Sequence, residues 1–277
     1  MKTPKRDEEG ARKYFADEKA KFIGLLKHVL TIGNAVGNRS ADPLRVIASW
    51  LYVRICVTGK SVESLLDPHE TGYGPIRYLD HAGIAILNRA LIENAAVLLY
   101  MCDLKISEDE WNCRRVLVDV HDFINRSQFL LKIDPTTSVD FPPDVLARLR
   151  KRLEDNAFFQ TLPARRRQRL LDGEDMFVSG RHEAMLQLGW GDDFTRGMYK
   201  YLSNQAHSLS MSFHRTAENE LYKNDSAGAQ VVAAFSLTFA RRALGAAALH
   251  MLELFQEIEL GFDQIVIAAI KKEYSVR

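Results

Sequence analysis

Residues 83–102, GIAILNRALIENAAVLLYMC, decide the fold of this chain. They predict a helix that is apolar on every side except at Asn88, Arg89, Glu93 and Asn94. A helix of this kind belongs in a protein core. Arg89 and Glu93 are therefore expected to be carried into the interior, where charges are stable only when paired and hydrogen-bonded. The sequence thus predicts a polar site inside a helical protein.

Helical signals dominate the rest of the chain as well. Asp42-Pro43, Asp80 and the capping box Ser107–Glu110 each predict the start of a helix. No alternating strand pattern of useful length and no internal repeat is visible. We therefore expect an all-α protein, a single helical-bundle domain of about seven main helices. The expected parts within 1–277 are an N-terminal helix in 1–40, a loop-rich basic insertion in 136–192 and a long C-terminal helix in 226–273.

The positions of several breaks in these helices can also be predicted. Pro68–Pro75 is expected to be a loop, and residues 143–160 and 163–171 are expected to be two short basic helices. One helix is expected from about Phe194 to Phe213. The last helix is expected to break at Gly261.

Composition and charge narrow the cellular setting. The charges of the 37 basic and 36 acidic residues nearly cancel. This balance argues against a protein whose whole surface binds polyanions but permits local basic patches. The charged residues 1–20 do not read as a signal peptide, and Arg241 and Arg242 interrupt the apolar stretch 227–255, so no membrane partner is expected. The cysteines form no CxxC pair and are expected to be reduced thiols of a cytoplasmic protein: Cys56, Cys102 and Cys113.

Common cofactor and metal motifs are missing. Gly59-Lys60-Ser61 lacks the earlier glycine of a phosphate-binding loop, because Arg54 stands in its place. The chain has no His-Glu-x-x-His helix, no Glu-x-x-His pair and no Gly-x-Ser-x-Gly elbow. We therefore expect neither a cofactor nor a metal.

Two constellations carry the candidate chemistry. Arg89 and Glu93 lie four residues apart and share a helix face, so Glu93 can orient the guanidinium toward a phosphate or carboxylate. Tyr199, Ser203 and His207 lie at i, i+4 and i+8 and form one polar stripe that contains a possible general acid or base. Each set also has a structural interpretation, as a buried salt bridge and as a histidine hydrogen-bonded within a helix interface. If the stripe faces the ion pair, the two sets form one site.

A third group of residues is basic. Eight cationic side chains lie within 22 residues. Such clusters often contact the phosphates of nucleic acids, but they also occur as solvated helix faces. The candidate nucleic-acid-binding residues are Arg148, Arg150, Lys151, Arg152, Arg165, Arg166, Arg167 and Arg169.

The motifs Asn88-Arg89-Ala-Leu-Ile-Glu93 and Tyr199-x-x-Leu202-Ser203-x-x-x-His207-Ser208 resemble a family of uncharacterised bacterial helical proteins. The resemblance covers roughly residues 75–215. It implies an all-helical fold and singles out Arg89, Glu93, Tyr199, Ser203 and His207. A more distant resemblance is to HEPN-type helical domains, many of which are toxin or phage-defence ribonucleases. Arg115 and His121 match the Arg-x(4–6)-His spacing of those enzymes, whereas His207 has only Lys200 seven residues before it.

These observations support two hypotheses of different kinds. The first is a protein that binds or cleaves RNA or a nucleotide in a stress or phage-defence role, with Arg89 on the phosphate and His207 near the scissile group. The second is a non-enzymatic helical module for protein interaction, whose Arg/Glu/His cluster is structural. The long apolar helices leave a homo-oligomer or another protein partner open. Whether the chain is an enzyme depends on which hypothesis holds.

Overall fold

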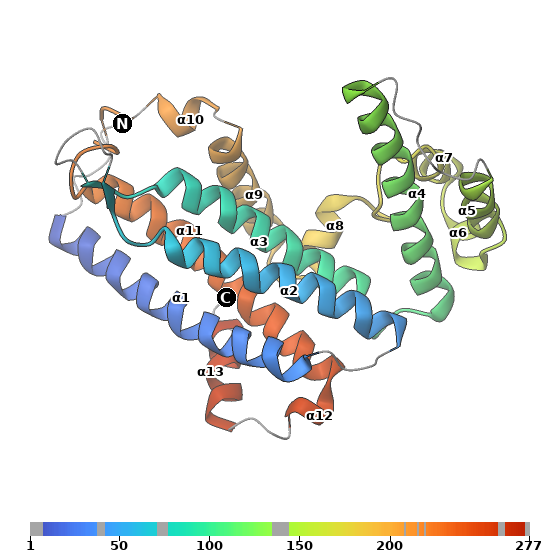
Figure 1. The fold of residues 1–277 in the computed structure, drawn as a ribbon, viewed down its shortest axis with the longest axis horizontal. Coiled ribbons are helices and arrows are strands. Elements are labelled where there is room, and N and C mark those ends of the chain that lie inside the picture. Colours follow the sequence, from blue (N-terminus) through green and yellow to red (C-terminus); the bar gives the residue numbers. More distant parts are fainter. Residues whose placement is uncertain are drawn as a thin grey trace. The chain divides into compact units, whose positions relative to one another are not determined.

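The computed structural model describes residues 8–37, 42–70, 77–134, 144–207, 209–214, 216–218, 220–259 and 264–274. Most of them are helical, so the all-α prediction is confirmed (Figure 1). The described residues form thirteen helices, several of them a single turn long, rather than about seven. The helices are α1 (Glu8–Val36), α2 (Pro43–Ser64), α3 (His81–Met101), α4 (Glu108–Ile133), α5 (Val145–Glu154), α6 (Ala157–Thr161), α7 (Ala164–Leu171), α8 (Arg181–Leu186), α9 (Asp192–Ala206), α10 (Ser210–Phe213), α11 (Ala227–Leu254), α12 (Gln256–Glu259) and α13 (Gln264–Tyr274).

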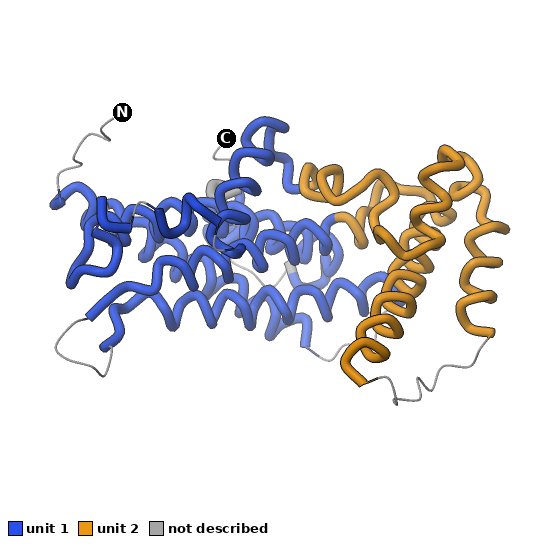
Figure 2. The backbone as a smooth tube through the Cα atoms, turned by 90° about the horizontal axis from the view of Figure 1, so that it is seen from above, with its two compact units in different colours: residues 1–99, 188–277 blue, residues 100–187 orange. Residues whose placement is uncertain are grey.

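The chain divides into two compact units (Figure 2). Unit 1 comprises Met1–Leu99 and Leu188–Arg277, and unit 2 comprises Tyr100–Gln187. Unit 2 is therefore one continuous stretch of the sequence, and it interrupts the sequence of unit 1. It is longer than the predicted insertion in 136–192, because it begins at Tyr100 and includes α4.

In unit 1 the longest helix, α1, packs along α11, and α2 and α13 pack against this pair. α11 is rich in alanine, and its buried face is mostly small residues, which lets neighbouring backbones approach closely. Polar groups join the two helices inside the core. Arg241 donates two hydrogen bonds, of 3.1 and 3.3 Å, to one carboxylate oxygen of Glu18, and both side chains are buried. The α1–α11 pair is thus held by close packing and by one buried ion pair.

α3 contributes most of its apolar surface to the core of unit 1, as its sequence predicts. Leu91, Ile92 and Ala95 are fully buried, and Asn88 donates a hydrogen bond of 2.9 Å to the hydroxyl of Ser236 on α11. Asp80 accepts from the backbone N–H of Gly83 at the start of the helix, which confirms the predicted cap.

α3 and α11 are long and apolar enough to cross a membrane on length and composition alone. Within the structure, 72% of the most apolar part of α11 is buried and 44% of that of α3. A core helix of a soluble protein passes the same test, which makes this weak evidence for a membrane span.

Unit 2 is built around α4, which packs against α5, α6 and α7. Ser107 accepts from the backbone N–H of Glu110, so the predicted cap of α4 is confirmed. The core of the unit contains buried side chains from α4 and from the three short helices, among them Val116, Leu117, Leu153 and Phe159.

Several predicted helix boundaries are wrong, and local backbone geometry explains each one. The helix predicted in 143–160 divides into α5 and α6, because Asn156 adopts an extended conformation and caps α6 through the N–H of Phe159. The helix predicted from Phe194 to Phe213 divides into α9 and α10, since the backbone leaves the helix at His207. The long helix predicted in 226–273 ends at Leu254, because Phe255 leaves the helical region with φ −121° and ψ 63°.

Two short strands were not predicted. β1 (His69–Glu70) pairs antiparallel with β2 (Arg77–Tyr78), so part of the predicted loop Pro68–Pro75 is in a strand. The predicted break at Gly261 lies outside the described residues.

Candidate functional site

The side chain of Arg89 connects the two predicted constellations. Its Nε donates to Glu93 Oε1 at 3.2 Å, within α3. One terminal nitrogen donates to the hydroxyl of Tyr199 at 2.9 Å, and the other lies 3.1 Å from His207 Nε2. The structure therefore brings Arg89, Glu93, Tyr199 and His207 together in unit 1, and we call these four residues the Arg89 cluster.

The helical periods of α3 and α9 place the residues of each set on one face of the chain. Arg89 and Glu93 are one turn apart on α3. Tyr199 lies on α9 and His207 immediately after it, so two turns of helix separate the two residues. The two terminal nitrogens of one guanidinium reach both ends of that stripe, and its carbon lies 5.0 Å from the centre of the Tyr199 ring. The planar cation is thus fixed in orientation by an aromatic ring and three hydrogen-bond partners.

The cluster lies at the margin of the core. The side chain of Arg89 is 14% exposed and that of Glu93 is 32% exposed, while His207 belongs to the exposed residues. The prediction that the ion pair is carried into the interior therefore holds better for Arg89 than for Glu93. A solute can reach the histidine directly, because its side chain is open to solvent.

Hydrogen-bond chemistry determines the tautomer of His207. A guanidinium donates hydrogen bonds and cannot accept them. His207 Nε2 must therefore accept the bond from Arg89, which places the imidazole proton on Nδ1 in this arrangement. The formal charges of Arg89 and Glu93 cancel, so the cluster offers N–H donors without an excess of positive charge.

Ser203, between Tyr199 and His207 on the stripe, is placed differently. Its hydroxyl oxygen is buried and has no hydrogen-bond partner among the residues that the structure describes. An unsatisfied hydroxyl in this position is unusual in a folded protein. Ser203 belongs to the face that carries the cluster, but no hydrogen bond joins it to Arg89 among the described residues.

The basic segment lies in unit 2, and most of its side chains bind the unit itself. Arg150 donates two hydrogen bonds to the carbonyl of Leu171, and Arg166 donates to the carbonyls of Phe177 and Val178. These two arginines therefore bind the backbone of other segments within unit 2 and stabilise the arrangement of its short helices. Arg148, Lys151, Arg167 and Arg169 are paired with Asp144, Asp155, Gln160 and Glu174, and Arg152 and Arg165 are exposed.

Arg115 and His121 also lie in unit 2, on α4. The guanidinium of Arg115 lies 5.4 Å from the centre of the Trp111 ring, and its Nε is buried without a hydrogen-bond partner. No hydrogen bond joins the side chains of Arg115 and His121 in the described part of the chain. The spacing that resembles the HEPN motif is thus present in the sequence, and the structure shows no contact that makes it a site.

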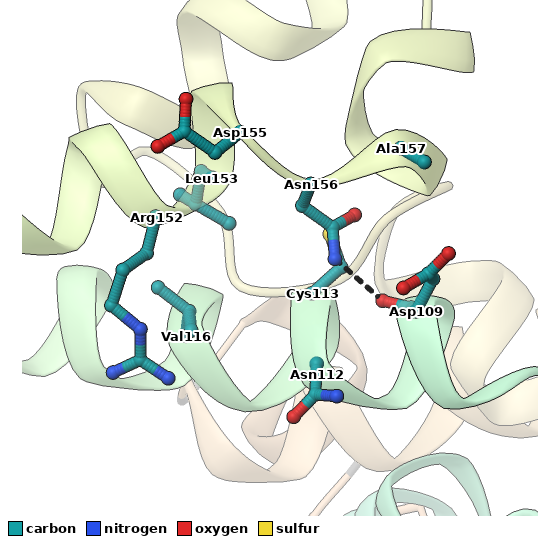
Figure 3. A pocket seen from close by; sticks show the side chains of 9 residues that line it. All are labelled: Asp109, Asn112, Cys113, Val116, Arg152, Leu153, Asp155, Asn156 and Ala157. Atoms are coloured by element: carbon teal, nitrogen blue, oxygen red, sulfur yellow. Dashed lines mark hydrogen bonds between the residues drawn. The ribbon is translucent and has the colours of Figure 1, made fainter.

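Unit 2 contains a pocket of about 380 Å³ (Figure 3). Its charged groups are Arg152, Asp109 and Asp155, all of them exposed, and Asn156 donates to the backbone carbonyl of Asp109 across one side. Carboxylates outnumber the single arginine, which makes this pocket a poor site for a phosphate. The remaining lining residues are Asn112, Cys113, Val116, Leu153 and Ala157.

Among the described residues, no three His, Cys, Asp or Glu side chains are grouped so that they could hold a metal ion. Cys56, Cys102 and Cys113 form no disulfide with one another. Burial raises the pKa of the Cys113 thiol to about 12, so it is a poor ligand and nucleophile.

No protein family, curated protein or solved structure matches this chain.

Proposed function

We propose that unit 1 binds the phosphate group of RNA or of a nucleotide at the Arg89 cluster. The observation that carries this proposal is the hydrogen bonding of Arg89 to both Tyr199 and His207 at a solvent-reachable edge of the core. Among the described residues, three of the five guanidinium N–H groups have partners, which leaves one N–H on each terminal nitrogen for a ligand. A planar guanidinium with two parallel donors matches two oxygens of a phosphate.

His207 places an imidazole next to the guanidinium. Its Nε2 accepts from Arg89, so its Nδ1–H points away from that bond. A phosphate that displaces Nε2 from Arg89 would leave this nitrogen able to accept a proton. Cleavage of RNA is a second step that binding would then allow: Nε2 takes the proton of the ribose 2′-hydroxyl, the 2′-oxygen bonds to phosphorus, and the P–O5′ bond breaks. The imidazolium returns the proton to the 5′-oxygen, which leaves a 2′,3′-cyclic phosphate and a 5′-hydroxyl.

Binding can be tested with a fluorescently labelled single-stranded RNA of about ten nucleotides, by anisotropy. We expect Arg89→Met and His207→Ala each to weaken binding by roughly tenfold or more, which corresponds to one lost charge-assisted or polar contact. Arg12→Met is the matched control, because Arg12 is an exposed arginine of α1 in the same unit, paired with Asp225. Equal affinity of Arg89→Met and the wild type for the RNA would exclude the proposal. Incubation of the same RNA with wild type and His207→Ala, followed by gel analysis, tests the cleavage step.

Salt dependence tests whether the basic segment of unit 2 takes part. For single strands, log K falls with log salt concentration with a slope of roughly −0.7 per phosphate contacted. Since six of the eight basic side chains already have partners within unit 2, we expect a shallow slope, equivalent to about one or two phosphates. A slope equivalent to six or more would assign the main contact to the basic segment.

The alternative function is a helical module for protein interaction. It is favoured by a stripe of exposed apolar side chains on α2, where Trp50 is 70% exposed and Val53 and Val57 follow on the same face. In that case the Arg89 cluster only fixes α3 to α9. Trp50→Ala would then remove the interaction with a partner protein, and Arg89→Met would lower stability without affecting any phosphate ligand.

A further inference from the structure

Glu93 gives the cluster a property that phosphate recognition alone does not require. Phosphate sites commonly gather several cations, whereas Arg89 is paired here with a carboxylate on the next turn of the same helix. Glu93 is also 32% exposed and bonds the same guanidinium that a ligand of Arg89 would bind, so its carboxylate lies close to that ligand. Its negative charge therefore acts on that ligand and not only on the guanidinium.

The charge balance of the cluster limits the charge of its ligand. Arg89 contributes +1 and Glu93 contributes −1, and His207 accepts at Nε2 as a neutral imidazole. An anion with one charge gains the guanidinium donors and meets one carboxylate. A phosphomonoester has close to two charges above its second pKa of about 6. Its desolvation cost grows with the square of the charge, whereas the attraction of Arg89, offset by Glu93, grows only in proportion to the charge.

We propose that Glu93 selects singly charged phosphodiesters over doubly charged phosphomonoesters at the Arg89 cluster. This inference rests on the proposed phosphate binding and narrows its ligand to an internal phosphate of a nucleic-acid strand, in preference to a free nucleotide. Glu93 is then a specificity-determining residue as well as an anchor for Arg89. The two roles can be separated, because a neutral amide retains the oxygen that accepts from Arg89 Nε.

The charge of the ligand can be changed without changing the protein. The probes are thymidine 5′-monophosphate, a dianion at pH 8, and its methyl ester, a monoanion that differs by one methyl group. Calorimetry at pH 8 and low salt should show the methyl ester binding to the wild type roughly tenfold more tightly, because the Arg89–Glu93 pair has no net charge and does not offset the larger desolvation cost of the dianion. A monophosphate that binds as tightly as its ester, or more tightly, would overturn the inference.

The variant Glu93→Gln tests the same idea from the side of the protein. We expect it to bind the monophosphate roughly tenfold more tightly than the wild type does and the ester only about threefold more tightly, because the gain grows with the charge of the ligand, so that the preference narrows. Asp122→Asn is the matched control: it removes one carboxylate from an exposed Asp–Arg pair with the same spacing, on α4 of unit 2, and should leave the preference intact.

Failure of this inference is distinguishable from failure of the proposed function. If the labelled RNA, the monophosphate and the ester all bind equally poorly to the wild type and to Arg89→Met, phosphate binding at the cluster is excluded. If the RNA binds in an Arg89-dependent way and Glu93→Gln leaves the ratio of the two thymidine probes unchanged, only the role of Glu93 is excluded.

Discussion

Arg89 in unit 1 and Arg114 in unit 2 are two arginines with similar local surroundings and different partners. Each pairs with a glutamate one turn away on its own helix, and each lies over a tyrosine ring, at 5.0 Å for Arg89 and 3.9 Å for Arg114. Arg114 is 7% exposed and also donates to the backbone carbonyl of Tyr100. Arg89 instead bonds the side chains of Tyr199 and His207.

The difference shows how a structural arginine can be told from a candidate functional one. A backbone carbonyl cannot be released without disturbing the chain that carries it, so the bond to Tyr100 fixes Arg114 in place. The hydroxyl of Tyr100, in turn, accepts from the backbone N–H of Val178, which extends the same fixed arrangement. Side-chain partners can rotate away from Arg89 when a ligand arrives. Both arginines have an ion pair and an aromatic ring. They differ in their remaining partners, which are a backbone carbonyl for Arg114 and side chains for Arg89.

Replacement of Arg114 tests the structural half of this comparison and should have the largest effect. Arg114→Met removes the bonds to Glu110 and to the carbonyl of Tyr100 from a buried setting, which should cost about 3 kcal/mol of unfolding free energy. Urea denaturation of the full chain measures this. Arg126→Met, at an exposed pair of the same helix, should cost less than about 0.5 kcal/mol. Similar losses for the two variants would remove the structural role of Arg114.

Replacement of Arg89 should give the opposite balance between stability and binding. We expect Arg89→Met to cost only about 1–2 kcal/mol of unfolding free energy, because its partners lie at the edge of the core and can be hydrated. Arg89→Met should weaken the affinity for RNA, measured by anisotropy, by roughly tenfold or more. Arg114→Met, assayed under conditions in which it is folded, should bind RNA as the wild type does. A destabilisation of Arg89→Met as large as that of Arg114→Met, with binding unchanged, would identify both arginines as structural.

Burial of His81 in unit 1 makes the stability of the protein depend on pH. His81 is 1% exposed and lies 5.3 Å from the Tyr222 ring, and burial lowers its pKa below the ordinary value of 6.5. The unfolded chain therefore takes up this proton first as pH falls, so the stabilising contribution of neutral His81 is present above pH 6.5 and lost as pH falls through the folded-state pKa.

His81→Leu should accordingly remove part of the acid sensitivity of the protein. The unfolding free energy of the wild type should fall relative to that of the variant by at most about 1.4 kcal/mol per pH unit below pH 6.5, while the two curves run parallel at pH 7–8. Urea denaturation at several pH values gives both curves. Parallel curves down to pH 5 would show that His81 is protonated equally easily in the folded and unfolded chains.

The smallest expected effect is that of the N-terminal cap of α4, whose loss should lower the stability of unit 2 without changing the affinity for RNA. Ser107→Ala removes the acceptor for the N–H of Glu110 and should cost about 1 kcal/mol. It should leave the binding of RNA unchanged, since Ser107 lies in unit 2 and the Arg89 cluster in unit 1. Ser107→Asp is the control, because aspartate also caps helices and should restore stability. A loss of RNA affinity in Ser107→Ala that the control reverses would connect unit 2 to the site.

The features that could be predicted from the sequence are those set by a few adjacent residues. The caps at Asp42 and Ser107 depend on a side chain three residues before its N–H partner, and both are confirmed. The Arg89–Glu93 pair depends on one helical turn. Breaks inside helices were missed at Asn156 and His207, where one residue leaves the helical conformation and no proline or glycine lies within five residues on either side.

The partners of charged side chains could not be predicted from the sequence. Arg150 and Arg166 looked like candidate phosphate ligands, and only the folded chain shows the carbonyls that they bind. Arg114 was not among the predicted paired residues, although Glu110 four residues earlier is a signal for an ion pair. The alignment of Arg89 with Tyr199 and His207 depends on the packing of helices far apart in the sequence, which no local pattern encodes.

The division of unit 1 into two chain segments has a consequence for synthesis of the protein. α3 with Arg89 leaves the ribosome before the whole of unit 2, and α9 with Tyr199 leaves after it. At translation rates of about 5–20 residues per second, Arg89 waits on the order of ten seconds for its partners. By the end of that interval unit 2 is complete in sequence, and until then the cluster does not exist. A chain whose synthesis stops within unit 2 would carry Arg89 and Glu93 but not Tyr199 and His207, which orient the guanidinium.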